Sequence, residues 1–283
     1  MASTKPKAVT TGYNVGKIQK IQSFVEELLR GYFPKLSKAP NALYVIMATI
    51  GFESGWELLH KRGSQVSSMH GFYTGSTGGA AGDYRRGPLI QNLLRNPNVT
   101  SQTVENINQG CVAHGLSATM GYYYVKGVPA NVQRFKGYRP LVDSLGMEVA
   151  PGESITALFA ANDDLAKKRS LASGLIIMET DYERFLSKGN SPSAAISKAI
   201  GSYLGALGVK DKNGTTPEMR VEQVLGGKQQ VTSLLQQAGI SKDGTVFANN
   251  SQSVPSTPTV SNTQTRTAST SSEPKKTPGC PTV

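Results

Sequence analysis

Three observations predict a mainly α fold (α+β class) with one small β element and a disordered C-terminal tail. Apolar residues recur at helical spacing in most segments up to about residue 245. Residues 41–53 are apolar on nearly every side, which is typical of a buried central helix. Only residues 115–125 are rich in β-forming side chains.

The N-terminal half of the chain begins with an amphipathic segment. Apolar side chains from Ile18 to Leu29 follow a 3.6-residue period and predict a helix that ends near Gly31. Residues 37–41, with Pro40, resemble a helix start, so we expect the apolar helix of residues 41–53 to follow directly. Residues 63–87 are rich in Gly and Ser without periodicity, and predict a long surface loop.

The rest of the chain alternates short helical patterns with the β-rich segment. Residues 115–125, bounded by Gly127, predict a short strand or hairpin that contains Tyr122, Tyr123 and Tyr124. Further helices are expected at residues 88–94, 104–114, 155–163, 170–188, 193–205, 217–225 and 229–238.

The domain organisation follows from length and composition. The chain of 283 residues can bury a substantial core, and one domain is the simpler interpretation. Residues 1–36, with the amphipathic helix, belong to this domain, whose main body is residues 37–245. Residues 246–283 are dominated by Ser, Thr and Pro and predict a disordered tail, either a solvated segment or one that becomes ordered on a partner.

The charge indicates an anionic partner. The formal net charge is +11 and the pI is about 9.6, so nucleic acid, anionic lipid and bacterial cell wall are all candidates. Lys and Arg are spread along the chain without an aromatic and basic recognition motif, which makes nucleic acid an unlikely partner. No run approaches the roughly 20 apolar residues of a membrane span, and residues 1–20 do not resemble a signal peptide. Cys111 and Cys280 do not form a disulfide framework.

Glu53 is the candidate catalytic residue. At about 100° per residue it lies about 70° from the centre of a buried stripe, and therefore at the edge of a buried face. The stripe consists of Leu43, Ile46, Met47 and Ile50. Partial desolvation and the negative end of its own helix both favour the neutral acid, which suits a group that protonates a leaving oxygen. The alternative is a glutamate at a helix end that is exposed or paired with an arginine.

Three motifs in order resemble the lysozyme-like superfamily, which includes soluble lytic transglycosylases, phage tail lysozymes and phage N-acetylmuramidases. Residues 46–56 resemble its catalytic helix, which ends in Glu-Ser-Gly-aromatic. Residues 115–122 resemble the Gly-Leu-x-Gln-x-Met-Gly-aromatic strand of the muramidases, and residues 199–205 resemble the Ala-Tyr-Asn-x-Gly helix of the transglycosylases. The resemblance spans residues 41–225.

The resemblance implies cleavage of the β-1,4 bond between N-acetylmuramic acid and N-acetylglucosamine in peptidoglycan, with Glu53 as acid and then as base. It also implies that Tyr203 hydrogen-bonds Glu53. The implied substrate-binding residues are Ser54, Met120, Gly121, Tyr122, Tyr123 and Tyr203.

Two positions depart from the family pattern. Ala118 stands where Gln is usual and Leu204 where Asn is usual, so two polar contacts to sugar are lost. Glycosidases ordinarily use two carboxylates, and the sequence offers Glu57, Asp83 and Glu105 without a motif around any of them. Lytic transglycosylases use one glutamate and the sugar's own N-acetyl and 6-hydroxyl groups, which implies a 1,6-anhydro product; plain hydrolysis stays open.

No metal or cofactor is expected. His60, His70 and His114 have no ligand partner at metal-binding spacing. The glycines of residues 75–82 lack the Lys-Ser/Thr ending of a phosphate-binding loop. Ser54 lacks the surroundings of a nucleophilic serine.

Three functional hypotheses remain. The first is a peptidoglycan-degrading enzyme of the phage type, made in the host cytoplasm and carried in the virion at the tail or baseplate. The second is a structural tail or baseplate protein that retains a lysozyme-like fold with little activity, and whose C-terminal tail engages other phage tail proteins; the losses at Ala118 and Leu204 favour it. The third is a nucleic-acid binder, which only the net charge favours.

Overall fold

The described part of a computed structural model comprises residues 15–58, 84–205, 207, 208, 210, 214–225 and 229–242. Residues 63–83 of the loop predicted at residues 63–87 and the predicted tail at residues 246–283 lie outside it, as do His60, His70 and Asp83. The last residues of the predicted loop include a short 3₁₀ helix at residues 84–86. Among the described residues, none of the helices combines the length and apolar character that crossing a bilayer requires.

The described residues are mainly helical, as predicted, and their sheet has two strands. The α-helices are α1 (Val15–Tyr32), α2 (Ala42–Ser54), α4 (Pro88–Leu94), α5 (Ser101–Asn108), α6 (Pro129–Phe135), α7 (Arg139–Leu145), α8 (Asp164–Ser187), α9 (Pro192–Leu204), α10 (Pro217–Leu225) and α11 (Gln229–Gln237). The strands are β1 (Ala113–His114) and β2 (Thr119–Met120). The 3₁₀ helices are η1 (Leu36–Lys38), η2 (Tyr84–Arg86), η3 (Gln109–Cys111), η4 (Gly121–Tyr124), η5 (Lys136–Tyr138) and η6 (Ile155–Leu158).

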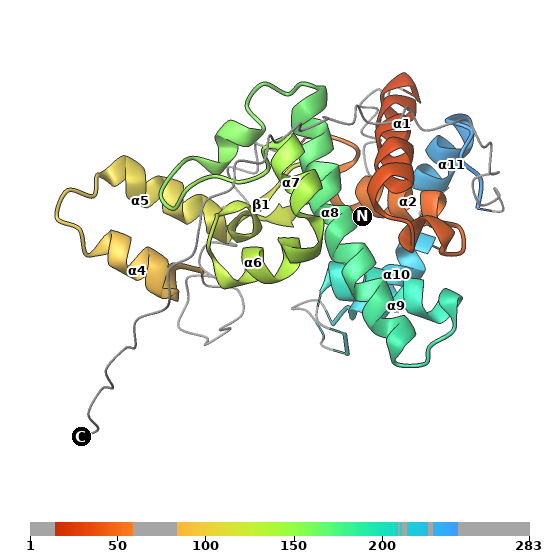
Figure 1. The fold of residues 1–283 in the computed structure, drawn as a ribbon. Coiled ribbons are helices and arrows are strands. Elements are labelled where there is room, and N and C mark those ends of the chain that lie inside the picture. Colours follow the sequence, from red (N-terminus) through yellow and green to blue (C-terminus); the bar gives the residue numbers. More distant parts are fainter. Residues whose placement is uncertain are drawn as a thin grey trace, which may run out of the picture. The chain divides into compact units, whose positions relative to one another are not determined.

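The long helix α8 organises the fold. It contacts α1, α6, α7 and α9, which surround it in Figure 1. Its side chains from Ser170 to Glu179 are all buried, so it forms the centre of the hydrophobic core. The carboxyl of Asp163 accepts a hydrogen bond from the Ala166 amide, which caps the helix at its positive end.

The two N-terminal helices match their predictions closely. α1 buries the predicted apolar stripe, and α2 is buried at Ala42 and from Tyr44 to Ile50. Asn41 precedes α2 in a left-handed conformation, with φ of 54°, so Pro40 lies just outside the helix and not in its first turn. α1, α2 and α11 contact one another, which places the buried helix α2 inside this group (Figure 1).

Several predicted elements are wrong in extent. The expected helix at residues 155–163 is only the short η6 followed by a turn, because Asn162 has a φ of 50° and Asp163 starts α8 as its cap. The expected helix at residues 104–114 ends at Asn108, where η3 and then β1 follow. α6 and α7, each with proline in its first turn, were not predicted.

The β element is a hairpin, which is one of the two forms predicted for it, a short strand or a hairpin. Ala113 pairs with Met120 and His114 with Thr119, and the strands are antiparallel. The expectation that the three tyrosines stand in a strand is wrong, because residues 121–124 form η4.

Candidate functional site

The end of α2 is shaped by the packing of Trp56 against Gly51. A Cβ at position 51 would lie 2.3 Å from the Trp56 ring, so only glycine lets the indole lie flat on the helix. Gly55 adopts a left-handed conformation, with φ of 63°, which ends the helix and turns the chain back. The indole N–H then donates to the Met47 carbonyl at 3.1 Å.

This packing fixes the position of Glu53. Two residues along a helix correspond to about 200°, so Glu53 projects from the side of α2 opposite to Gly51 and Trp56. Its side chain is partly buried. The neighbouring Ser54 hydroxyl donates to the Ile50 carbonyl at 3.0 Å, which leaves only its oxygen lone pairs for a ligand.

The hairpin turn docks on α8. The Ser117 amide donates to the Ser170 hydroxyl at 3.2 Å, and a Cβ at Gly115 would lie 2.1 Å from the same hydroxyl oxygen. One turn along α8, a Cβ at Gly174 would lie 2.5 Å from the Ser117 hydroxyl oxygen. Two glycines therefore allow the turn and the helix to approach closely.

Tyr203 joins the three motif segments. Its hydroxyl, on α9, donates a hydrogen bond to the Ser117 carbonyl in the hairpin turn. Burial raises the pKa of Tyr203 well above its usual value, and the negative charge of Glu53 raises this pKa further. The hydroxyl proton is given to the Ser117 carbonyl, and not to Glu53 as the resemblance implies. The structure thus joins α9 directly to the hairpin turn, and the Glu53 carboxyl on α2 acts on Tyr203 through its charge.

The other residues named by the middle motif serve mainly as packing. Tyr122 is 8% exposed and Tyr124 is fully buried, with its ring edge against Phe159 at 5.3 Å between centroids. Burial also raises the pKa of Tyr124 to about 12. Tyr123 is partly exposed and its ring contacts Tyr122 at 4.6 Å, so it is the one of the three tyrosines with a ring open to a ligand.

Met120 and Gly121 complete the hairpin side of the site. Met120 is partly buried and packs against the core. A Cβ at Gly121 would lie 2.2 Å from the Gln109 carbonyl oxygen, and the Gly121 amide donates to Val112 at 2.7 Å. Gly121 is therefore required for the close approach of η4 to η3.

The two departures from the family pattern have structural roles. Leu204 is 7% exposed and packs in the hydrophobic core. Ala118 has a φ of 47°, a left-handed conformation that is uncommon for alanine.

The candidate second carboxylates that the structure describes have other surroundings. Glu57 is mostly exposed and forms an ion pair with Lys17 of α1. Glu105 is exposed on α5. The carboxyl whose charge acts on Tyr203 is Glu53.

His114 is an interior residue. A ring nitrogen lies 2.8 Å from the Gln109 carbonyl oxygen, and the ring stacks on Phe159 at 6.0 Å between centroids. Burial lowers the pKa of His114 to about 4, so the ring is neutral at pH 7. Within the described segments, no group of three His, Cys, Asp or Glu side chains is placed to hold a metal ion.

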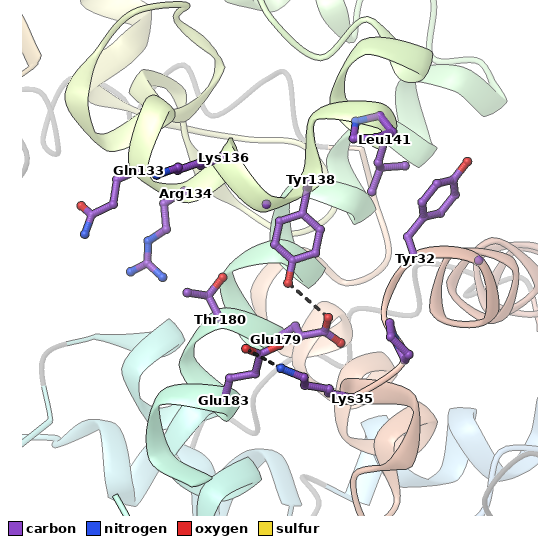
Figure 2. A pocket seen from close by; sticks show the side chains of 14 residues that line it. Tyr32, Lys35, Gln133, Arg134, Lys136, Tyr138, Leu141, Glu179, Thr180 and Glu183 are labelled. Atoms are coloured by element: carbon purple, nitrogen blue, oxygen red, sulfur yellow. Dashed lines mark hydrogen bonds and ion pairs between the residues drawn. The ribbon is translucent and has the colours of Figure 1, made fainter. Parts of the chain in front are cut away.

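Sequence reasoning missed a pocket around Glu179 on α8. This carboxyl is only 3% exposed, and it accepts a hydrogen bond from the Leu36 amide at 2.7 Å. It accepts a second one from the Tyr138 hydroxyl at 3.2 Å, which Figure 2 shows. Burial is the main cause that raises the pKa of Glu179. The sequence signal for this pocket is Glu179 itself, which lies between the mostly apolar residues 171–178 and Tyr182. A carboxyl in such surroundings must face either a polar partner or a cavity.

Comparisons of the chain with known protein families, with curated proteins and with solved structures found no match.

Proposed function

We propose that this protein is a peptidoglycan-degrading glycosidase, a lytic transglycosylase or muramidase, that uses Glu53 as its general acid and base. The observation that carries the proposal is the hydrogen bond from the Tyr203 hydroxyl to the Ser117 carbonyl, together with the charge that the partly buried Glu53 exerts on Tyr203. These groups come from three segments that are far apart in the sequence, and they are the segments whose motifs resemble those of the lysozyme-like superfamily.

The proposed reaction uses one carboxyl twice. Protonated Glu53 gives its proton to the bridging oxygen as the bond from that oxygen to C1 of N-acetylmuramic acid breaks. Positive charge develops at C1 and on the ring oxygen. The 6-hydroxyl of the same sugar then attacks C1 and its proton returns to Glu53, which yields the 1,6-anhydro product. Water in place of the 6-hydroxyl yields the hydrolytic product.

Tyr203 is a positioning residue in this proposal. Its hydroxyl is protonated at neutral pH, as in any tyrosine, and donates to the Ser117 carbonyl. The hydroxyl thereby links α9 to the hairpin turn beside Glu53. Tyr123, Met120 and Ser54 are the remaining residues that we propose for contacts to the sugars, because each retains an exposed surface or acceptor lone pairs.

The strong positive charge is consistent with an anionic wall as the partner. We propose further that the protein is carried in a phage virion, at the tail or baseplate. The second candidate, a structural tail protein with little activity, is favoured by one observation: Leu204 and Ala118 leave the site without two polar side chains.

The test is the release of soluble fragments from purified peptidoglycan, measured by loss of turbidity and by product mass. We expect release by the wild type and none above background by Glu53→Gln. Glu57→Gln is the matched control, since it removes an exposed carboxyl just beyond the end of α2, and it should keep full activity. An anhydro product mass identifies a transglycosylase. If the wild type releases no fragments from several types of wall, the proposed enzyme activity is contradicted and the structural tail protein is favoured.

A further inference from the structure

A cavity of about 890 Å³ lies on α8 around Glu179. The end of α1 with Pro34 and Lys35 forms one side of it, and α6, η5 and the start of α7 form the other (Figure 2). Its volume is within the range of about 300–1,000 Å³ that is typical of ligand pockets.

The floor of the pocket is held rigidly. The Glu179 carboxyl is fixed from two directions, by the Leu36 amide at 2.7 Å and by the Tyr138 hydroxyl at 3.2 Å. The Tyr138 ring is fixed in turn by Phe33, at 5.5 Å between centroids. Each carboxylate oxygen accepts one bond here and keeps further lone pairs, so the floor presents preformed acceptors to a ligand.

The walls combine apolar rings with hydrogen-bond donors. Tyr32 is 42% exposed at one rim, and Pro34 and Leu141 lie beside it. On the other rim Figure 2 shows Gln133 and Lys136, both exposed, whose side chains donate hydrogen bonds. A ligand that fits must offer an apolar face to the rings, donors to the floor and acceptors to this rim.

The charges favour a hydroxyl-rich ligand over a phosphate or a simple cation. Lys35 forms an ion pair with Glu183 at 2.9 Å, and Arg134 forms one with Asp181 at 3.3 Å, so much of the charge at the pocket is already balanced. The buried Glu179 carboxyl repels an anionic group from the floor. A saccharide, with an apolar ring face and hydroxyl donors and acceptors around its edge, meets all of these requirements.

The pocket lies on a different side of α8 from the turn at Ser117. Gly174 faces Ser117 and the Tyr203 hydroxyl. Glu179 follows five residues later and is therefore rotated by about 140° around the helix. A glycan held in this pocket does not occupy the site at Glu53.

We propose that this pocket is a second saccharide site, which binds an N-acetylated amino-sugar segment of the wall glycan while another segment is cleaved at Glu53. The choice of this glycan rests on the proposed function. The pocket adds affinity for long or insoluble glycan and contributes nothing to the cleavage of fragments too short to reach it. It lowers the concentration of wall that half-maximal activity requires without changing the rate at saturation.

The variants are Tyr32→Ala and Gln133→Ala, alone and together, because both side chains are exposed at the rim and contribute little to the core. Val132→Ala is the matched control, since Val132 is 53% exposed on the same helix as Gln133 but does not line the pocket. All are made in full-length protein with Glu53→Gln, which prevents cleavage during the binding measurement. Thermal unfolding establishes that each variant is folded.

Two measurements test the site. The first is depletion of protein by purified insoluble peptidoglycan, and the double variant should bind roughly tenfold more weakly than the Val132→Ala control. The second is a titration with tri-N-acetylchitotriose followed by NMR of protein with ¹³C-labelled tyrosine. The Tyr138 ring signals should shift in the control and much less in the double variant.

Equal binding by the double variant and the control, or no shift of the Tyr138 signals, overturns the inference. Peptide-free glycan strands, prepared with an amidase, should bind as well as intact peptidoglycan; binding that requires the stem peptides also overturns it. The oligosaccharide titration does not depend on catalysis. If Glu53→Gln retains cleavage, the proposed function fails while the titration still reports on the pocket.

Discussion

The indole nitrogen of Trp56 lies 3.1 Å from the Met47 carbonyl oxygen, to which it donates a hydrogen bond across nine residues of chain. This bond fastens the segment after Glu53 to the helix that carries Glu53. Because the indole also lies on Gly51, the last turn of α2 is held between a buried ring and the core. The motif around Glu53 thus stabilises the end of α2 in addition to carrying the candidate catalytic carboxyl.

Gly51→Ala should therefore disturb both stability and the site. The added methyl would lie 2.3 Å from the Trp56 ring, and the ring is buried, so it cannot move away freely. We expect a loss of about 1–3 kcal/mol in the free energy of unfolding, measured by urea denaturation.

Gly31→Ala is the control for this loss. No atom lies within 4 Å of a Cβ at this position, so stability should be unchanged or rise by up to about 1 kcal/mol. Equal effects of the two substitutions would show that the contact with Trp56 is not responsible.

Tyr203→Phe should reduce activity more than it reduces substrate binding. The substitution removes the hydroxyl that donates to the Ser117 carbonyl and leaves that buried acceptor without its partner, which costs about 1–2 kcal/mol of stability. Because the hydroxyl links α9 to the turn beside Glu53, we expect a lower kcat on soluble glycan fragments with a KM close to that of the wild type.

Ser202→Ala is the matched control for Tyr203→Phe. It removes the adjacent hydroxyl, which accepts a hydrogen bond from Arg184 at the surface. Loss of activity in both variants, or a change confined to KM in Tyr203→Phe, would argue against a positioning role.

The helices that could be predicted from the sequence are those whose buried side chains recur at a regular spacing along it. α1 is recognisable because its apolar side chains recur at helical spacing, and α2 because it is apolar on nearly every side and has no charged residue before Glu53. α6 and α7 were missed because each has only seven residues, too few for a period to stand out, although Pro129 and Pro140 mark their first turns. The start of α8 was missed because Asp163 was not recognised as a cap.

The candidate site was less predictable than the fold. The order of the motifs suggested that Glu53 and Tyr203 meet, but the contact of Tyr203 with the Ser117 backbone depends on how α8 and α9 pack. The three consecutive tyrosines are indistinguishable in sequence, and only the 3₁₀ turn decides that Tyr124 is buried while Tyr123 is partly exposed. The Glu179 pocket is formed by five elements, α1, α6, η5, α7 and α8, so no local sequence pattern indicates it.

Ala118→Gly should stabilise the protein. Ala118 has a φ of 47°, where the alanine Cβ is strained and glycine is not. We expect a gain of about 0.5–1 kcal/mol in the free energy of unfolding, because the relief of strain outweighs the greater freedom of glycine in the unfolded chain. Ala118→Val should cost more than 1 kcal/mol, since β-branched residues tolerate this conformation worst. Equal stability of all three proteins would contradict the strained turn.

His114 should make the protein less stable as the pH falls from about 6.5 to about 4. The ring nitrogen beside the Gln109 carbonyl must carry the hydrogen, and burial, the dominant cause, lowers the pKa of the folded state from 6.5 to about 4. In this range the unfolded chain binds the proton and the folded chain does not, so protonation favours unfolding. The full stability is present above pH 6.5, and about 3 kcal/mol of it is lost by pH 4.

Urea denaturation at several pH values, compared between the wild type and His114→Asn, isolates this effect from the titration of carboxyl groups that both proteins share. His114→Asn should be less stable at pH 7, because it loses the stacking on Phe159. Its stability should then fall less steeply than that of the wild type between pH 6.5 and 4, so that the two curves converge. Parallel curves would mean that His114 takes up its proton in the folded protein as readily as in the unfolded chain, which the burial of its ring makes unfavourable.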